Sequence, residues 1–156
     1  KEMMVETSAY YVIPAYRAGI DDASEGSVSF SFSRDADILY FKDRIHKYIS
    51  RLCEDLKSAV INKQTATLAS SDVALEVSSI FEALKFRLGF ITRTELMRAY
   101  NIGKARLYID AGISEAEVAH DDEVCAKCAQ IKAIKIDRFM NFDSVPPFHP
   151  ECMCII

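Results

Sequence analysis

The sequence predicts a mainly α fold: a three-helix body with an extended N-terminal arm and a small C-terminal β-hairpin closed by a Cys/His knuckle. Three observations lead to this prediction. Glycine and proline are scarce, with 5 and 4 occurrences in 156 residues, which favours helices over many tight-turned strands. Apolar residues recur every three or four positions through the middle of the chain. Four of the five cysteines fall after residue 124.

Three regions follow: an arm over residues 1–32, a helical body over 33–112 and a stapled C-terminal subdomain over 113–156. Pro14 early and Gly19 late favour a short helix within the arm. Residues 27–33 alternate polar and apolar side chains, which predicts an extended strand. The arm either contacts another protein or folds back on the helices, because its aromatic residues have no evident partner. They are Tyr10, Tyr11, Tyr16, Phe30 and Phe32.

The first helix of the body is predicted from its cap and its apolar spacing. Ser33 is a good N-cap, and the helix should run to about Asn62. Its apolar stripe is either ordinary core or an oligomer seam, and Cys53 lies on the apolar side, where we expect it in the core. The stripe consists of Ile38, Phe41, Ile45, Tyr48, Leu52, Leu56 and Ala59.

Two further helices complete the predicted body. The second spans residues 72–88, and Gly89 is expected to end it. The third begins at Thr92, whose side chain can form a capping box with Glu95, and it closes at Gly112. The capping role accounts for Glu95 without any part in catalysis.

A basic stretch lies between residues 85 and 106, where there are six basic residues and one acid. They do not share one helix face. They either contact phosphate groups of a nucleic acid or pair with the acidic segment 115–123. A net charge of −4 argues against a protein that coats nucleic acid. The six residues are Lys85, Arg87, Arg93, Arg98, Lys104 and Arg106.

The cysteine-rich end has the spacing of a metal site. It contains Cys125-x-x-Cys128 and, twenty residues later, His149-x-x-Cys152-x-Cys154. A two-residue gap lets both side chains of a pair turn toward one point, and two such pairs make a tetrahedral site for Zn²⁺. The first four residues fit this form, and Cys154 could replace His149 or Cys152. The alternatives are a disulfide across the loop, or reduced cysteines packed as small apolar residues.

The segment between the two pairs predicts a small hairpin. Residues 131–136 have the composition of a short strand, and Phe139 and Phe142 lie near its expected return. Pro146 and Pro147 hold the backbone extended before the second pair. Such a small, loop-rich segment has little hydrophobic core of its own. It therefore needs a metal or a disulfide to hold it.

Two motifs resemble a known family. Residues 122–128 and 145–154, which carry the cysteines, are similar to the closing signature of the phage Mu F-like minor head proteins. Upstream, residues 91–95 (Ile-Thr-Arg-Thr-Glu) and 100–103 (Tyr-Asn-Ile-Gly) resemble the family's helix that begins with an Arg-Thr-Glu run. The chain departs from the family pattern at Met153, where Arg is usual, and lacks the aromatic that usually precedes the first cysteine pair.

The resemblance implies a virion structural protein. We expect no enzymatic activity, because every polar residue considered above has an adequate structural role as a cap, a ligand or part of a solvated turn. Such a protein is a minor head or head-morphogenesis component of a tailed phage or prophage, present in multiple copies near the portal. Its expected partners are the portal or capsid protein, with a further role in DNA packaging or delivery. Its expected location is the phage head interior or the head–tail junction, after assembly in the host cytoplasm.

One alternative is a metal-dependent nuclease that uses His120, Asp121 and Asp122 beside the cysteines, since a His with carboxylates can hold a metal for phosphodiester cleavage. Another is a DNA-binding module with a zinc knuckle, which the basic stretch favours and the net charge disfavours. No apolar run approaches the roughly twenty residues needed to span a bilayer, so no membrane partner is expected.

Overall fold

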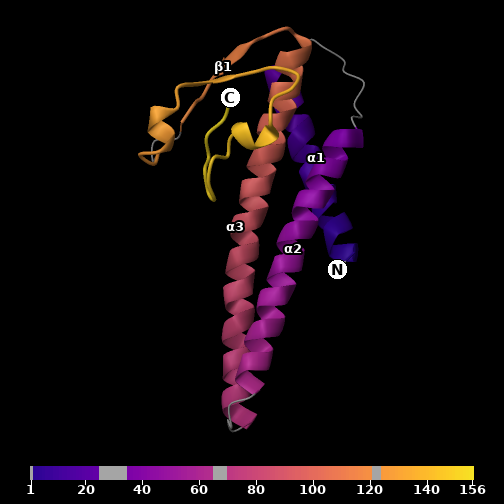
Figure 1. Cartoon of the computed structure of the whole chain (residues 1–156), viewed down its shortest axis with the longest axis vertical. Helices are drawn as coiled ribbons and strands as arrows, with labels where there is room; N and C mark the ends of the chain where they lie inside the picture. The colour runs from indigo at the N-terminus through magenta and orange to yellow at the C-terminus, as the bar shows by residue number, and fades with distance from the viewer. Residues whose placement is uncertain (1, 25–34, 65–69, 121–123) are drawn as a thin grey trace.

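The computed structural model describes residues 2–24, 35–64, 70–120 and 124–156. Its helices are α1 (Glu2–Ala23), α2 (Asp35–Gln64) and α3 (Ser70–Asp110). Figure 1 shows α2 and α3 as a long antiparallel hairpin, with α1 beside its upper half and the C-terminal segment beside the upper half of α3. The mainly α fold with a small C-terminal sheet and a Cys/His cluster is therefore confirmed.

The extended arm is wrong for residues 2–23, which form α1, and the short helix expected between Pro14 and Gly19 lies within this longer helix. This helix packs against α3 and buries Val12 and Tyr16. The Tyr16 ring meets Phe41 of α2 edge-on, and its hydroxyl donates a hydrogen bond to Asp37 at 2.8 Å. Folding back was thus the correct alternative for this part of the arm. The strand expected at residues 27–33 lies outside the described residues.

Two glycines let α1 approach α3 closely. A Cβ added at Gly19 would overlap the backbone oxygen of Tyr100, and one added at Gly103 would overlap the backbone oxygen of Tyr16. The two helices therefore meet backbone to backbone at these positions. Ala99 and Ile102, which lie beside this contact on α3, have no exposed surface.

α3 is one continuous helix, so the predicted break at Gly89 is wrong. A glycine inside a helix costs only about 1 kcal/mol relative to alanine, and packing on both sides of it outweighs that cost. The rings of Phe86 and Phe90 stack edge-on across this glycine with centroids 4.4 Å apart. The capping box is wrong for the same reason, because Thr92 and Glu95 lie in the middle of α3.

α2 closely matches the prediction, since it extends from Asp35 to Gln64. Phe41 and Ile45 of its predicted stripe are buried in a core that α1 and α3 complete, together with Ile49, which the predicted stripe did not include. Cys53 is exposed, so its predicted place in the core is wrong. It lies on α2 beyond the part of the helix that α1 covers.

The C-terminal segment forms a two-stranded antiparallel sheet. Strand β2 (Ala133–Lys135) lies within the predicted strand, but its partner is β1 (Glu115–Glu117), and not the return expected near Phe139 and Phe142. The first cysteine pair therefore sits in the connection between β1 and β2. A second core, separate from that of the helices, fills this unit and packs on Ala105 of α3. Its other buried members are Ala116, Val118, Cys128, Ile136, Val145, Cys152, Cys154 and Ile156.

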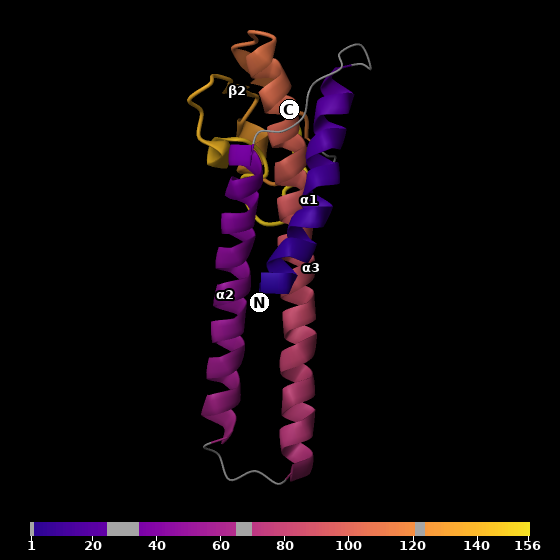
Figure 2. The same ribbon diagram turned by 90° about the vertical axis from the view of Figure 1, so that its right-hand side faces the viewer.

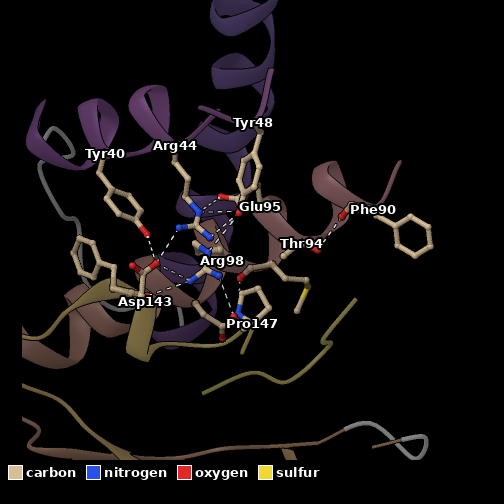
Figure 3. Close-up of polar contacts among 12 residues, drawn as sticks. Tyr40, Arg44, Tyr48, Phe90, Thr94, Glu95, Arg98, Asp143 and Pro147 are labelled. Atoms are coloured by element: carbon tan, nitrogen blue, oxygen red, sulfur yellow. Dashed lines mark hydrogen bonds and ion pairs between the residues drawn. The ribbon is translucent and has the colours of Figure 1, made fainter. Parts of the chain in front are cut away.

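A charged cluster joins the C-terminal segment to α2 and α3 (Figure 3). The Arg44 Nε of α2 donates to both carboxylate oxygens of Glu95 on α3, at 3.0 and 2.9 Å, and its Nη1 donates to Asp143 at 2.9 Å. Burial raises the pKa of Tyr40 to about 12, so its hydroxyl stays protonated and donates to Asp143 at 3.2 Å. Arg98 lies 3.7 Å from both Glu95 and Asp143.

We expect Glu95→Ala to destabilise the protein by about 3 kcal/mol. Glu95 is only 3% exposed, so its loss removes the buried carboxylate that Arg44 and the buried Arg98 share and leaves them with the exposed carboxylate of Asp143. The matched control is Asp43→Asn, which removes an exposed pair with Lys47 and should change stability by less than about 0.5 kcal/mol. Denaturant unfolding of both variants measures the difference, and equal stabilities would contradict the assigned role.

Candidate metal centre

Three side chains of α3 hold the cysteine-containing C-terminus in place. Thr94, Arg98 and Asn101 follow one another at the i, i+4, i+7 spacing of a single helix face, and we call them the α3 ladder. The Thr94 hydroxyl accepts a hydrogen bond from the backbone N–H of Glu151 at 3.2 Å. The Arg98 guanidinium donates to the backbone oxygen of Pro147 at 3.0 Å. Both bonds are made by residues that lie close in sequence to the second ligand pair, His149 and Cys152.

Asn101 completes the α3 ladder and is fully buried. Its side-chain amide donates to the backbone oxygen of Cys154 at 3.0 Å and accepts from the backbone N–H of Ile156 at 3.0 Å. An amide that both donates and accepts in this way fixes the register of the segment against α3. α3 thereby sets where the side chains of residues 149–154 point.

The predicted ligands form two groups that share Cys128, which lies with Cys125 and His149 in one group and with Cys152 and Cys154 in the other. The Nε2 of His149 lies 3.1 Å from the Sγ atoms of both Cys125 and Cys128, and Cys128 Sγ lies 3.7 Å from Cys152 Sγ. Two thiolates bound to one tetrahedral zinc ion at about 2.3 Å are roughly 3.8 Å apart. A disulfide bond is only about 2.05 Å long. The sulfur separation therefore fits a shared metal ion, and all five thiols are free.

The tautomer of His149 suits metal binding. Its Nδ1 lies 2.7 Å from the backbone oxygen of Pro150. Because a carbonyl only accepts, Nδ1 carries the proton and Nε2 presents its lone pair toward Cys125 and Cys128. Histidines that bind metals usually donate their other ring N–H to a carbonyl or carboxylate in this way.

Cys154 has a different partner. Cys128, Cys152 and Cys154 also form a possible ligand group, so the thiol of Cys154 lies near enough to replace His149. However, its Sγ lies 3.3 Å from Nδ1 of His120, whose Nε2 donates to the backbone oxygen of Ile131 at 3.0 Å. In neutral His120 the Nδ1 is then an acceptor, and the Cys154 S–H donates to it. This bond favours Cys125, Cys128, His149 and Cys152 as the ligand set.

The pKa values are lowered for the thiols of Cys125 and Cys152 and raised for those of Cys128 and Cys154. Burial raises the pKa of Cys154 to about 11, which keeps its proton in place. Hydrogen bonding from the Cys128 backbone lowers the pKa of Cys125 to about 7. Burial opposes ionisation of Cys152, yet backbone hydrogen bonds from residues 154 and 148 outweigh it and lower its pKa. Burial raises the pKa of Cys128, so this thiol needs the metal ion itself to ionise.

Immediately after a chelator removes the metal, while the C-terminal unit still has its native packing, we expect Cys125 to be alkylated rapidly near neutral pH. Only the thiolate reacts, so the rate should rise as pH passes through about 7 and level off above it. Cys154, with its pKa near 11, should react far more slowly over the same range. Mass spectrometry after timed iodoacetamide treatment at several pH values locates the label. Equal labelling of the two cysteines at pH 7 would contradict this ordering.

The six basic residues predicted as phosphate contacts all lie beside carboxylates. Ion pairing, one of the two predicted alternatives, is therefore present, but the partners come from outside the acidic segment 115–123 that was expected to supply them. The pairs are Lys85–Glu82, Arg87–Asp55, Arg93–Glu151, Arg98–Glu95, Lys104–Asp22 and Arg106–Asp37. Contact of these residues with nucleic acid stays a prediction.

The residues of the alternative nuclease site are only partly described. His120 lies within the Cys/His cluster, where both of its ring nitrogens have partners. Asp121 and Asp122 lie outside the described residues. Sequence reasoning missed the bond from His120 to Cys154 and the part played by the α3 ladder. The i, i+4, i+7 spacing of Thr94, Arg98 and Asn101 within a predicted helix was the signal that could have revealed the ladder.

Comparisons with known proteins identify no relative. No protein-family model matches the chain, and no curated protein or solved structure matches it. In the described part of the chain, no helix is long and apolar enough to cross a membrane. The features that bear on function are therefore the geometry of the Cys/His cluster and the two motifs that resemble the minor head proteins.

Proposed function

We propose that this protein is a minor head component of a tailed phage whose C-terminal unit is held by one structural zinc ion. One observation supports the proposal: the two motifs that resemble the minor head proteins contact each other in the folded chain. Thr94 and Asn101 belong to the upstream motif, and they hydrogen-bond to residues 151 and 154 of the closing motif. Two motifs that form one interface behave as a single structural signature, which supports a common origin over chance similarity.

The proposed zinc is structural because its site is closed. Cys125, Cys128 and His149 already lie together, and Cys152, whose Sγ is 3.7 Å from that of Cys128, is the proposed fourth ligand that completes the tetrahedral number for zinc. A catalytic zinc site keeps one position for water or substrate. Three sulfur ligands also favour zinc over the hard cations magnesium and calcium, which take oxygen ligands.

The polar residues of the unit support a structural role over catalysis. Glu95 is engaged by Arg44, and the ring of His120 lies between Cys154 and Ile131. Neither residue is left in position to activate a water molecule. The proposed contribution of the unit is therefore to present a stable surface to the portal or capsid.

Metal analysis with a free-thiol count tests the zinc site. We expect one zinc ion per chain in native protein and near-complete loss of zinc in Cys128→Ser, because Cys128 contacts both His149 and Cys152. Cys53→Ser is the matched control, since Cys53 is exposed on α2 far from the cluster, and it should keep its zinc. A metal-free protein with a disulfide among these cysteines would sink the proposal.

The head assignment needs a separate test. Quantitative mass spectrometry of purified virions from a host that encodes this chain should find it in heads at a fixed, low copy number. Its absence from heads would contradict the assignment. Divalent-metal-dependent DNA cleavage that His120→Ala abolishes would instead establish the nuclease alternative. DNA binding that weakens steeply with salt, without cleavage, would favour the DNA-binding module.

A further inference from the structure

The Cys/His cluster offers more ligands than one tetrahedral ion can bind. Four ligands complete a tetrahedral zinc site, and the proposed zinc uses Cys125, Cys128, His149 and Cys152. Cys154 is left over, although it forms a ligand group with Cys128 and Cys152 in which all three residues are buried. All five residues line one cavity of about 160 Å³, so an ion that reaches the first group can also reach the second.

The arrangement that prepares His149 for a metal ion is repeated at His120. The Nε2 of His120 donates to the backbone oxygen of Ile131 at 3.0 Å, so its Nδ1 turns a lone pair toward Cys154 Sγ, 3.3 Å away. A nitrogen and a sulfur ligand of one zinc ion are roughly 3.6 Å apart. His120 and Cys154 therefore already have nearly the separation of two ligands of the same ion.

The fold itself holds this pair in place. Ala119 and Ile155 exchange both backbone hydrogen bonds, at 2.8 and 3.0 Å, which sets the neighbouring residues His120 and Cys154 side by side. The backbone oxygen of Cys154 also accepts a hydrogen bond from the buried Asn101 of α3. Figure 2 shows the resulting position of the C-terminus, beside the upper part of α3. A ligand pair that is held in this way loses little conformational freedom when it binds.

We propose that the second group binds a second thiophilic divalent ion, zinc or cadmium, beside the structural zinc. Its ligands are Cys128, Cys152, Cys154 and His120. The second site depends on the zinc site proposed above, because the thiolates of Cys128 and Cys152 bridge the two ions. When the second ion binds, the Cys154 thiol releases its proton to solvent. The His120 lone pair that accepted the hydrogen bond of this thiol then binds the ion instead.

The charge of the cluster favours two ions. Its four cysteines carry four negative charges when all are ionised, and two divalent ions balance them. A buried net charge is costly, so four thiolates are more stable with two ions than with one. Thiolate and imidazole ligands also select soft and borderline ions over magnesium and calcium. One ion is enough to close the structural site, so we expect the second to bind when metal is in excess.

Native mass spectrometry of the full chain in excess cadmium counts the ions that each chain binds. Cadmium is the probe because a thiolate-rich site prefers so soft an ion. We expect two ions in the wild-type chain. Cys154→Ser and His120→Phe each remove a ligand of the second ion alone, and each should weaken its binding by at least about 100-fold. Even the loss of a residue that only supports a ligand costs about 10–100-fold. Cys53→Ser is the matched control, because Cys53 is exposed on α2 outside the cluster, and it should keep both ions.

The number of bound ions separates the second site from the zinc site. No bound ion in the wild-type chain would overturn both proposals, whereas a limit of one ion per chain would overturn the second site alone. Two ions that Cys154→Ser and His120→Phe both retain would also overturn the second site. The first ion, which both variants should keep, shows that the C-terminal unit is still folded. His120→Phe keeps a ring at this position, so it tests the site even if Cys154→Ser fails to fold.

Discussion

Removal of the proposed zinc ion is expected to unfold the C-terminal unit while α1, α2 and α3 stay helical. Zinc sites of this kind contribute on the order of 10 kcal/mol to small metal-stabilised units. Here Cys128 and Cys152 are themselves buried in the core of the unit, so the loss of the ion places unsatisfied thiols where the chain is most tightly packed. The helical core around Phe41 and Ile102 is a separate cluster and should persist.

Hydrogen exchange in the presence of a strong chelator measures this effect. The backbone amides of Ala119 and Ile155, which bond across to each other's carbonyls, should exchange much faster after metal loss. Amides in the middle of α2 should keep their protection. Cys128→Ser should reproduce the pattern without chelator, and Cys53→Ser should not. Unchanged protection after verified metal loss would show that apolar packing alone holds the unit.

Gly103→Ala is expected to destabilise the protein by about 3 kcal/mol, as overpacking of a tight core contact does. The added methyl group would overlap the backbone oxygen of Tyr16, and backbone cannot rotate away as a flexible side chain can. α1 would have to move off α3, which uncovers Val12 and Ile102. Thermal and denaturant unfolding measure the change.

The matched control is Gly89→Ala on the same helix. Nothing lies within 4 Å of a Cβ built at Gly89, so alanine there should stabilise α3 by about 0.5–1 kcal/mol through helix propensity. The same substitution should lower the free energy of unfolding at Gly103 and raise it at Gly89. This difference separates the effect of packing from that of helix propensity. A stabilising Gly103→Ala would show that the two helices are not in close contact.

Helix α2 and the ligand pairs could be predicted because each depends on local spacing. Residues 35–64 carry one uninterrupted apolar stripe, and the Cys-x-x-Cys and His-x-x-Cys gaps fix how a pair can turn. The break at Gly89 was wrong because a local stop signal was given more weight than a continuous stripe. Leu84, Leu88 and Ile91 keep the same helical phase through that glycine, and this continuity was readable in the sequence.

Only the part of α1 between Pro14 and Gly19 was predicted as a helix, for a different reason. Pro14 lies inside it, and a proline in a helix interior removes a hydrogen bond, which argues locally against a helix. What holds α1 is the contact of Gly19 and Gly103 with backbone some eighty residues away in sequence. Likewise, the pairing of β1 with β2 depends on contacts between residues almost twenty positions apart. Such distant contacts leave no periodic signal in one sequence.

The order in which the ligands leave the ribosome follows from their order in the sequence. Cys125 and Cys128 are synthesised more than twenty residues before His149 and Cys152. At about 5–20 residues per second, this leaves a half-formed thiol pair on the nascent chain for roughly one to five seconds. α3 is already complete at that time. The α3 ladder can therefore bind residues 147–156 in the correct register as they emerge. This can happen before a metal ion binds to any of the five thiols.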